Sequence, residues 1–141
     1  MGNRPSDGGE SIGHFKADRE GVHLQAEVSK ANHGGFVQMK WPFAPELRLE
    51  QFEGVGVECR LQGASEFEAL LKSQQLWMPW QSYRISVRAN SDWQTVYFPF
   101  AAFKPYRTQT LLNPQRLSHF SLLMAQEGKQ VLSVRQLTLY R

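Results

Sequence analysis

Apolar side chains recur at every second position in several short runs of this sequence. In residues 21–29, GVHLQAEVS, one parity is apolar and the other is polar, and residues 54–62, GVGVECRLQ, repeat the pattern. A period of two is typical of a β-strand with one buried face, whereas an amphipathic helix has a period of about 3.6. The sequence therefore predicts β-strands rather than helices.

Similar runs follow along the rest of the chain, at residues 67–73, 82–90, 93–100, 117–125 and 131–141. Turn-forming groups such as ANHGG, QGAS, ANSD and QEGK separate them. About nine short strands without a long helix indicate an all-β fold, an antiparallel β-sandwich. Residues 45–54 could hold a single helical turn. In the last run the apolar parity changes, which predicts a β-bulge near Arg135 and Gln136.

The apolar parity of these runs also predicts the core. The residues expected to be buried between two sheets are Val57, Cys59, Leu61, Ile85, Val87, Val96, Phe98 and Leu122. Cys59 is the single cysteine, so an internal disulfide is excluded. Its position on an apolar strand face predicts a small core residue and not a nucleophile.

Length and hydrophobicity predict one domain. A chain of 141 residues with 41% hydrophobic residues can bury one sizeable core but hardly two. We expect a flexible N-terminal tract at residues 1–10 and a single β-sandwich domain at residues 11–141. The longest apolar runs are shorter than the roughly 20 residues that span a bilayer. The first residues resemble neither a signal peptide nor a transit peptide, so a cytoplasmic location is expected.

The charge is distributed unevenly. Residues 1–70 contain 7 Lys+Arg and 11 Asp+Glu, whereas residues 71–141 contain 9 and 2, within a net charge of +3. This asymmetry predicts a basic patch if the two halves stay apart in space. In a sandwich the halves usually interleave, and the charges then spread over the surface. The sequence is compatible with both alternatives.

No catalytic motif is recognisable. The chain lacks a nucleophile elbow, a metalloprotease motif and a phosphate-binding glycine loop, and its single GVG lies within a strand pattern. Glu66 and Glu68 are the one pairable set of carboxylates, because residues two apart on a strand lie about 6.6 Å apart on one face. A solvated strand edge is the favoured interpretation of this pair. We expect a protein that is not an enzyme.

The histidines do not form a ligand set in the sequence. His23 falls on the polar face of a strand, His33 lies in a turn, and His14 and His119 lie within strand patterns, each without a partner at ligand spacing. Structural roles are favoured for all four. Neither a metal site nor a cofactor is expected.

The segment LWMPWQSYR contains the most prominent aromatic pair. Trp77 and Trp80 flank Met78 and Pro79 in what is expected to be a loop, since proline does not fit a central strand. Exposed tryptophans suit a sugar ring or a partner protein. Alternatively, both side chains fold over the end of the sandwich as a plug. Nucleic-acid binding is not expected, because the aromatic spacing of RNA-binding motifs is absent.

Seven blocks in order carry a family resemblance. They are GGES with Phe15, NHGGF, FEGVGVECRLQG, WQSYRISV, DWQTVYFPFAAFKPYR, LNPQRLSHFSLLMA and VRQLTLYR. Together they resemble the complex I intermediate-associated protein family and cover nearly the whole chain. The resemblance implies a jelly roll similar to galactose-binding-like domains. It also implies that most aromatics of residues 91–107 belong to the core.

The resemblance implies a role in assembly. Eukaryotic members are mitochondrial assembly factors for the respiratory NADH:ubiquinone oxidoreductase, and related domains serve photosystem subunit synthesis. The absence of an import signal favours a bacterial member or a shortened chain. We expect a non-enzymatic protein-binding module that contacts subunits of a respiratory or photosynthetic complex. The alternative is a carbohydrate-binding module that uses Trp77 and Trp80. The candidate contact residues are Trp77, Met78, Trp80, Arg84, Arg88, Tyr106 and Arg107.

Overall fold

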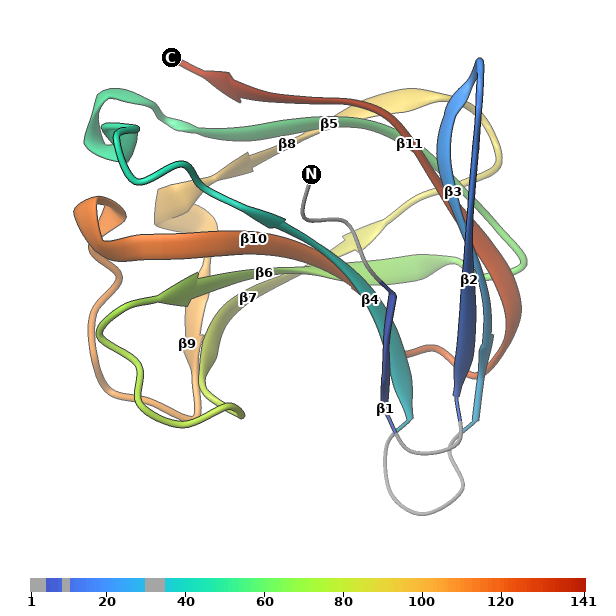
Figure 1. The fold of residues 1–141 in the computed structure, drawn as a ribbon, viewed down its shortest axis with the longest axis horizontal. Helices are drawn as coiled ribbons and strands as arrows, with labels where there is room; N and C mark the ends of the chain where they lie inside the picture. Colours follow the sequence, from blue (N-terminus) through green and yellow to red (C-terminus); the bar gives the residue numbers. More distant parts are fainter. Residues whose placement is uncertain (1–4, 9–10, 30–34) are drawn as a thin grey trace.

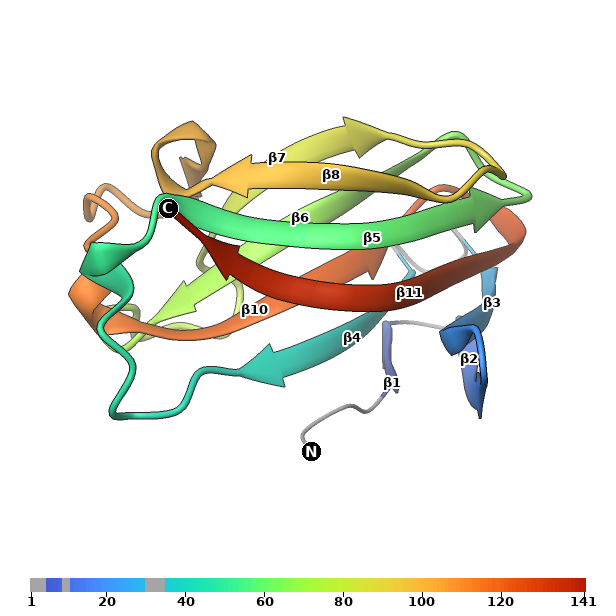
Figure 2. The same cartoon turned by 90° about the horizontal axis from the view of Figure 1, so that it is seen from above.

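Two antiparallel sheets pack face to face in the computed structural model of the protein, which describes residues 5–8, 11–29 and 35–141 (Figures 1 and 2). One sheet has the strand order β1-β4-β10-β6-β7-β9, and the other has the order β2-β3-β11-β5-β8. All pairings are antiparallel. The predicted all-β antiparallel sandwich is confirmed.

The six-stranded sheet contains β1 (Pro5–Gly8), β4 (Phe36–Pro42), β10 (Leu117–Met124), β6 (Glu66–Ser73), β7 (Ser82–Arg88) and β9 (Lys104–Tyr106). Strand β1 pairs with β4 and lies in the N-terminal tract that the sequence predicts to be flexible. The domain boundary at residue 11 stays a prediction. The turn around His33 lies outside the described residues.

The five-stranded sheet contains β2 (Ile12–Asp18), β3 (Gly21–Val28), β11 (Gly128–Tyr140), β5 (Gly54–Gln62) and β8 (Gln94–Pro99). The register between β11 and β5 shifts between Val134 and Gln136, which confirms the predicted bulge. Three short 3-10 helices complete the described elements: η1 (Leu49–Gln51), η2 (Phe100–Ala102) and η3 (Pro114–Arg116). Nothing helical in the described ranges is long and apolar enough to cross a membrane.

The GVG sequence has a structural explanation in this sheet. A Cβ at Gly54 would overlap the backbone carbonyl of Phe98 on the neighbouring strand. At Gly56 the same atom would lie 3.1 Å from the hydroxyl of Thr138. Glycine is therefore required at Gly54 by the close approach of β5 and β8.

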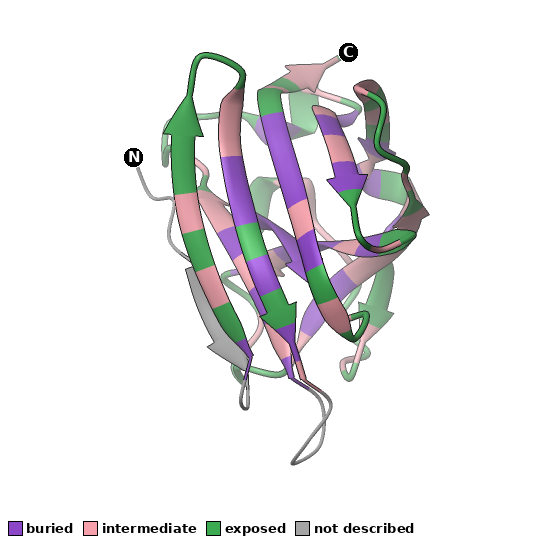
Figure 3. Cartoon of the chain, turned by 90° about the vertical axis from the view of Figure 1, so that its right-hand side faces the viewer, coloured by how far each residue is buried: buried purple, intermediate pink, exposed green. Residues whose placement is uncertain are grey.

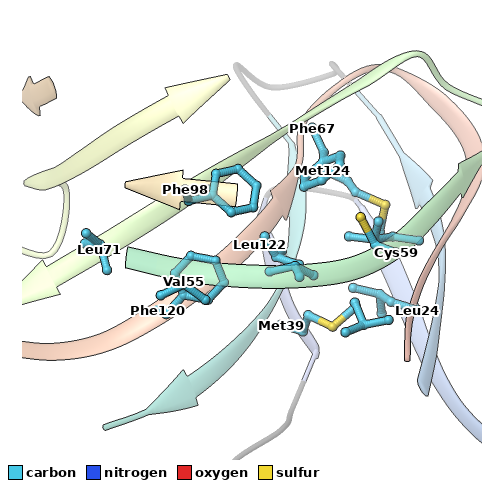
Figure 4. Packing of buried hydrophobic residues seen from close by; sticks show 14 of the residues in the cluster. Leu24, Met39, Val55, Cys59, Phe67, Leu71, Phe98, Phe120, Leu122 and Met124 are labelled. Atoms are coloured by element: carbon cyan, nitrogen blue, oxygen red, sulfur yellow. The ribbon is translucent and has the colours of Figure 1, made fainter. Parts of the chain in front are cut away.

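The core lies between the sheets and contains most of the residues that the sequence predicts (Figure 4). Val57, Cys59, Leu61, Phe98 and Leu122 are fully buried, as predicted. The other three predicted core residues, Ile85, Val87 and Val96, are partly buried against the cluster. Ile85 and Val87 lie on β7 beyond Arg84, the last residue that pairs with β9, so this part of β7 has a neighbouring strand on one side only. Val96 lies on β8, which is the edge strand of its sheet.

Two side chains differ from their predicted environments. Tyr97 is 60% exposed and packs edge-on against Tyr140, with 5.1 Å between ring centroids, although the aromatic segment was expected to be mainly core. The neighbouring Phe98, Phe100 and Phe103 are buried as expected. His23, predicted on a polar face, is 7% exposed because its imidazole lies between Ser133 and Asp18.

Burial in this sheet decreases towards the β2 edge, where no residue of the strand is fully buried (Figure 3). Strand β3, its neighbour, buries Leu24, Ala26 and Val28 on the core side. An edge strand has a partner on one side alone, so its side chains are less covered. The burial of Leu24, Ala26 and Val28 confirms the inward face predicted for residues 21–29.

Cys59 is expected to resist thiol reagents in the native protein. Its side chain is buried, and desolvation together with the nearby Glu58 carboxylate raises the pKa of the thiol to about 11. Because the thiolate is the reactive form, labelling should begin only after unfolding. Mass spectrometry after timed treatment with iodoacetamide, with and without denaturant, measures this difference. Rapid labelling of the native chain would contradict the burial of this β5 face.

Candidate functional site

A cleft of about 850 Å³ lies on the face of the six-stranded sheet that points away from the core. This sheet curves, with β4 on one side of β10 and β6 and β9 on the other (Figure 1). The cleft is lined by Gly35, Phe36, Gln38, Lys40, Glu68, Leu70, Lys72, Pro79, Trp80, Arg84, Tyr106, Arg107, His119, Ser121, Leu123 and Ala125. It therefore crosses five strands of the sheet.

Strand register places one row of side chains across the floor of this cleft. Lys40 is opposite Ser121, Ser121 is opposite Leu70, Leu70 is opposite Arg84, and Arg84 is opposite Lys104. Directly paired residues share a face of the sheet, so all five point outward, and the first four line the cleft. Ser121 is 1% exposed and Leu70 is 4% exposed. The row thus has cations at both ends, and the two residues at its centre are uncharged and buried.

Positive charge dominates the cleft. Lys40, Lys72, Arg84 and Arg107 line it together with a single carboxylate, Glu68. Glu68 is 3.9 Å from Arg84 in an ion pair. Among the described residues, no ion pair involves Lys40, Lys72 or Arg107. The cleft therefore keeps an excess of positive charge at neutral pH.

Burial and neighbouring cations lower the pKa values of two groups in the cleft. Burial, followed by the charges of Lys40 and Lys72, lowers the pKa of His119 to about 4. Burial, followed by Arg84 and Lys40, also lowers the pKa of Lys72. In both cases a second positive charge is disfavoured in the same space. His119 is consequently neutral at pH 7.

Two polar side chains attach the tryptophan loop to the cleft. Lys72 donates through Nζ to the carbonyl oxygen of Pro79 at 2.5 Å and also to that of Gln81. The Gln81 amide oxygen accepts from the backbone N–H groups of Trp77 and Met78, each at 3.2 Å. Its Nε2 donates to the carbonyl oxygen of Arg107, also at 3.2 Å. The loop between β6 and β7 is therefore joined to the exit of β9.

Tyr106 is covered by cations on the β9 side of the cleft. The Arg84 guanidinium carbon is 3.9 Å from the centre of the Tyr106 ring, and that of Arg107 is 5.4 Å away. Arg107 has a φ of +57°, the one positive φ of a non-glycine residue in the described ranges. This left-handed conformation is sparsely populated for arginine and is often found at binding sites.

The structure brings together four of the seven candidate residues. Trp80, Arg84, Tyr106 and Arg107 line the cleft. Trp77 and Met78 lie on the same loop outside the lining, and Arg88 is exposed at the end of β7. The exposed fractions of Trp77, Met78 and Trp80 are 88%, 44% and 53%, so the tryptophans project into solvent and do not form a plug. Whether these residues contact a partner stays a prediction.

Sequence reasoning missed Lys40, Lys72, Gln81 and His119 as cleft residues. The alternation of FEALLKS and LSHFSLLMA places Lys72 and His119 on polar strand faces. Without the strand order, however, nothing in the sequence indicates that β4, β10 and β6 are neighbours. The excess of basic residues in the second half of the chain was the available signal.

A second group, on the other sheet, has ligand atoms within 4.8 Å of one another: Asp18, Glu20 and His23. Both imidazole nitrogens of His23 are already engaged, by Ser133 at 2.6 Å and by Asp18 at 3.0 Å. Glu20 is 3.6 Å from Arg60. The hydrogen bond to His23 lowers the pKa of Asp18. These contacts give the group a structural role in the β2–β3 hairpin.

Comparison with known proteins agrees with this architecture. The family model described as Complex I intermediate-associated protein 30 (CIA30) matches residues 5–135. The chain belongs to the CIA30 family. No curated protein sequence matches this CIA30 chain significantly.

Several solved structures similar to this CIA30 protein are carbohydrate-binding modules. A family 11 module from Clostridium thermocellum, in complex with a β-1,3-1,4-mixed-linked tetrasaccharide, has a TM-score of 0.78 and 14% identity, covering 99% of this chain and 89% of that one. The family 11 module of the cellulase Lic26A-Cel5E from the same organism has a TM-score of 0.79 and 12% identity, covering 99% and 88%. A structure titled with CBM4 has a TM-score of 0.57 and 12% identity, covering 92% and 89%. At these identities the similarity shows the fold, a jelly-roll sandwich like that of the family 11 module.

Proposed function

We propose that this CIA30 protein is a non-enzymatic binding module that assists the assembly of a membrane-associated respiratory complex by holding one of its protein subunits. Membership in the family supports the class of partner, because the family is named for intermediates of complex I. A photosynthetic complex is the alternative assembly that such a module could assist. A cytoplasmic location, where such subunits are exposed before insertion, stays a prediction.

The observation that carries the binding site is the cleft with the tryptophan loop at its rim. Trp80 is 53% exposed and contributes to the cleft lining, and Trp77 lies beside it on the same loop. Tryptophan, tyrosine and arginine are the residue types that most often dominate interface energies. Lys72 and Gln81 hold the loop by hydrogen bonds, so the aromatic rings are presented on an ordered support.

Carbohydrate binding is the second candidate function. The specific observation is the similarity to family 11 modules over 99% of the chain, one of them solved with a mixed-linked tetrasaccharide. Exposed tryptophans such as Trp77 and Trp80 also suit the faces of sugar rings. A screen against soluble glycans, including a β-1,3-1,4-glucan, separates this function from protein binding.

Replacing Trp77 and Trp80 together by alanine should abolish partner capture while preserving the fold. Both side chains are largely exposed, so we expect Tm to change by only a few degrees. The tagged double variant, purified from its own host, should lose the respiratory or photosynthetic subunits that accompany the unmodified chain. Quantitative mass spectrometry of the copurifying proteins measures the loss.

The matched control is Tyr97→Ala, which removes an exposed aromatic ring from the other sheet. This variant should retain every partner. Loss of the same subunits in both variants would indicate a general effect of surface aromatics, and unfolding of the double variant would show that the tryptophans are structural. If the double variant folds and keeps all partners, the contact surface lies elsewhere, such as at Arg88.

A further inference from the structure

We propose that the cleft of the six-stranded sheet binds an extended acidic segment of the partner protein, with carboxylates placed on Lys40 and Arg84. This proposal rests on the proposed function for the nature of the polymer. It adds the charge and the spacing of the segment that is recognised.

The first argument is charge complementarity. Lys40, Lys72 and Arg107 lack a carboxylate partner among the described residues, and Glu68 neutralises only part of the charge of Arg84. Burial lowers the pKa values of His119 and Lys72, and the charges of neighbouring cations lower them further. A site of this kind attracts negative charge and repels a basic segment.

The second argument is the nature of the cleft floor. Leu70 and Leu123 are each 4% exposed and Ser121 is 1% exposed, so the floor itself offers little contact area. The groups above it are the half-buried Lys40, Lys72 and Arg84, together with the rim residue Trp80. A ligand in the cleft therefore contacts mainly cationic side chains. Salt bridges, rather than contact with the floor, select which ligand binds.

The third argument concerns Tyr106, which a neutral sugar would use as a stacking surface. Arg84 is 3.9 Å from the centre of this ring and Arg107 is 5.4 Å away. Two cations thus compete with a sugar for the aromatic faces. Among the described lining residues, Trp80 remains the most exposed aromatic ring. The cleft is consequently better equipped for carboxylates than for the rings of a neutral glucan.

Strand spacing predicts the separation of the carboxylates. Lys40 and Arg84 are in one row, separated by three strand intervals through β10 and β6, or about 14 Å between backbones. An extended peptide advances about 3.3 Å per residue, so residues about four apart span roughly this distance. Side chains at this separation also point to the same side. The segment should therefore carry acidic residues about four positions apart.

The direct test uses a soluble peptide that repeats the unit Glu-Ala-Val-Ala. Its control has glutamine at each glutamate. Isothermal titration and intrinsic tryptophan fluorescence should detect binding of the glutamate peptide and show at least about tenfold weaker binding of the glutamine peptide. Binding of the glutamate peptide should weaken as salt is raised, because exposed charge pairs are screened.

Lys40→Glu places a negative charge in the cleft and should weaken binding of the glutamate peptide by at least about tenfold. Lys16→Glu makes the same charge change on the exposed strand β2 of the other sheet and should leave binding unchanged. Circular dichroism melts verify that both variants fold. If Lys40→Glu does not fold, Lys40→Gln takes its place and should still weaken binding severalfold.

Equal binding of the glutamate and glutamine peptides, or no binding of either, would overturn the proposal. Stronger binding of polygalacturonate would identify an acidic glycan as the ligand and would also overturn it, as would binding of a neutral β-1,3-1,4-glucan that Lys40→Glu does not alter. These failures are distinguishable from failure of the proposed function. If subunits still copurify in a manner that depends on Trp77 and Trp80, the proposed function as a binding module stands. Only the proposal of acidic specificity is then wrong.

Discussion

Replacing Phe98 by alanine is expected to lower the free energy of unfolding by about 3–5 kcal/mol. The Phe98 side chain is 1% exposed at the centre of the sandwich (Figure 4). Its ring centroid lies 6.5 Å from that of Phe67, 6.4 Å from Phe103 and 5.9 Å from Phe120. The variant loses these contacts and leaves a cavity between two sheets that pair extensively along their strands and cannot collapse around it.

Urea unfolding followed by circular dichroism measures the effect of Phe98→Ala. The adjacent residue offers a control, because Tyr97 is 60% exposed and points to the other side of β8. Tyr97→Ala should cost much less, since its main contact is the edge-on packing with Tyr140. Equal losses in the two variants would contradict the assignment of the inward face of β8.

Acidification should destabilise the protein through His119. In the unfolded chain this imidazole takes up a proton near its ordinary pKa of 6.5, whereas the folded cleft lowers the pKa to about 4. The unfolded state therefore binds more protons between these values, and stability falls as the pH falls from about 6.5 to 4. The ring is partly exposed, so solvent screening limits the loss to about 1–2 kcal/mol.

The charged groups that face His119 are Lys40 on β4 and Lys72 on β6, with Arg84 and Glu68 also in the cleft. His119→Gln should flatten the fall in stability over this pH range, and Lys40→Gln should raise the pKa of His119 in an NMR titration. His14→Gln, on the exposed strand β2, is the control for loss of an imidazole. A pH dependence that is the same in the two histidine variants would contradict this role of the cleft.

Local patterns in the sequence are sufficient to predict the strands and much of the core. Alternation of apolar residues correctly indicates the inward faces of β3 and β5, and the parity change in β11 correctly indicates its bulge. These features depend on neighbours within one strand, because side chains alternate between faces whatever the strand order. The tryptophan loop is likewise predictable from Pro79, which no central strand would accommodate.

The cleft could not be predicted in this way. Lys40, Lys72, Arg84 and His119 come from four strands. Strands β6 and β7 are consecutive, but β4 and β10 are distant from them in the sequence and become neighbours through the order β4-β10-β6-β7. The burial of His119 and its proximity to Lys40 and Lys72, which together lower its pKa, exist only when these strands are paired. The sequence determined which residues face outward on each strand, whereas tertiary structure decided which of them share a surface. The physical reason is that strand pairing is a long-range choice, and electrostatic interactions depend on the resulting distances.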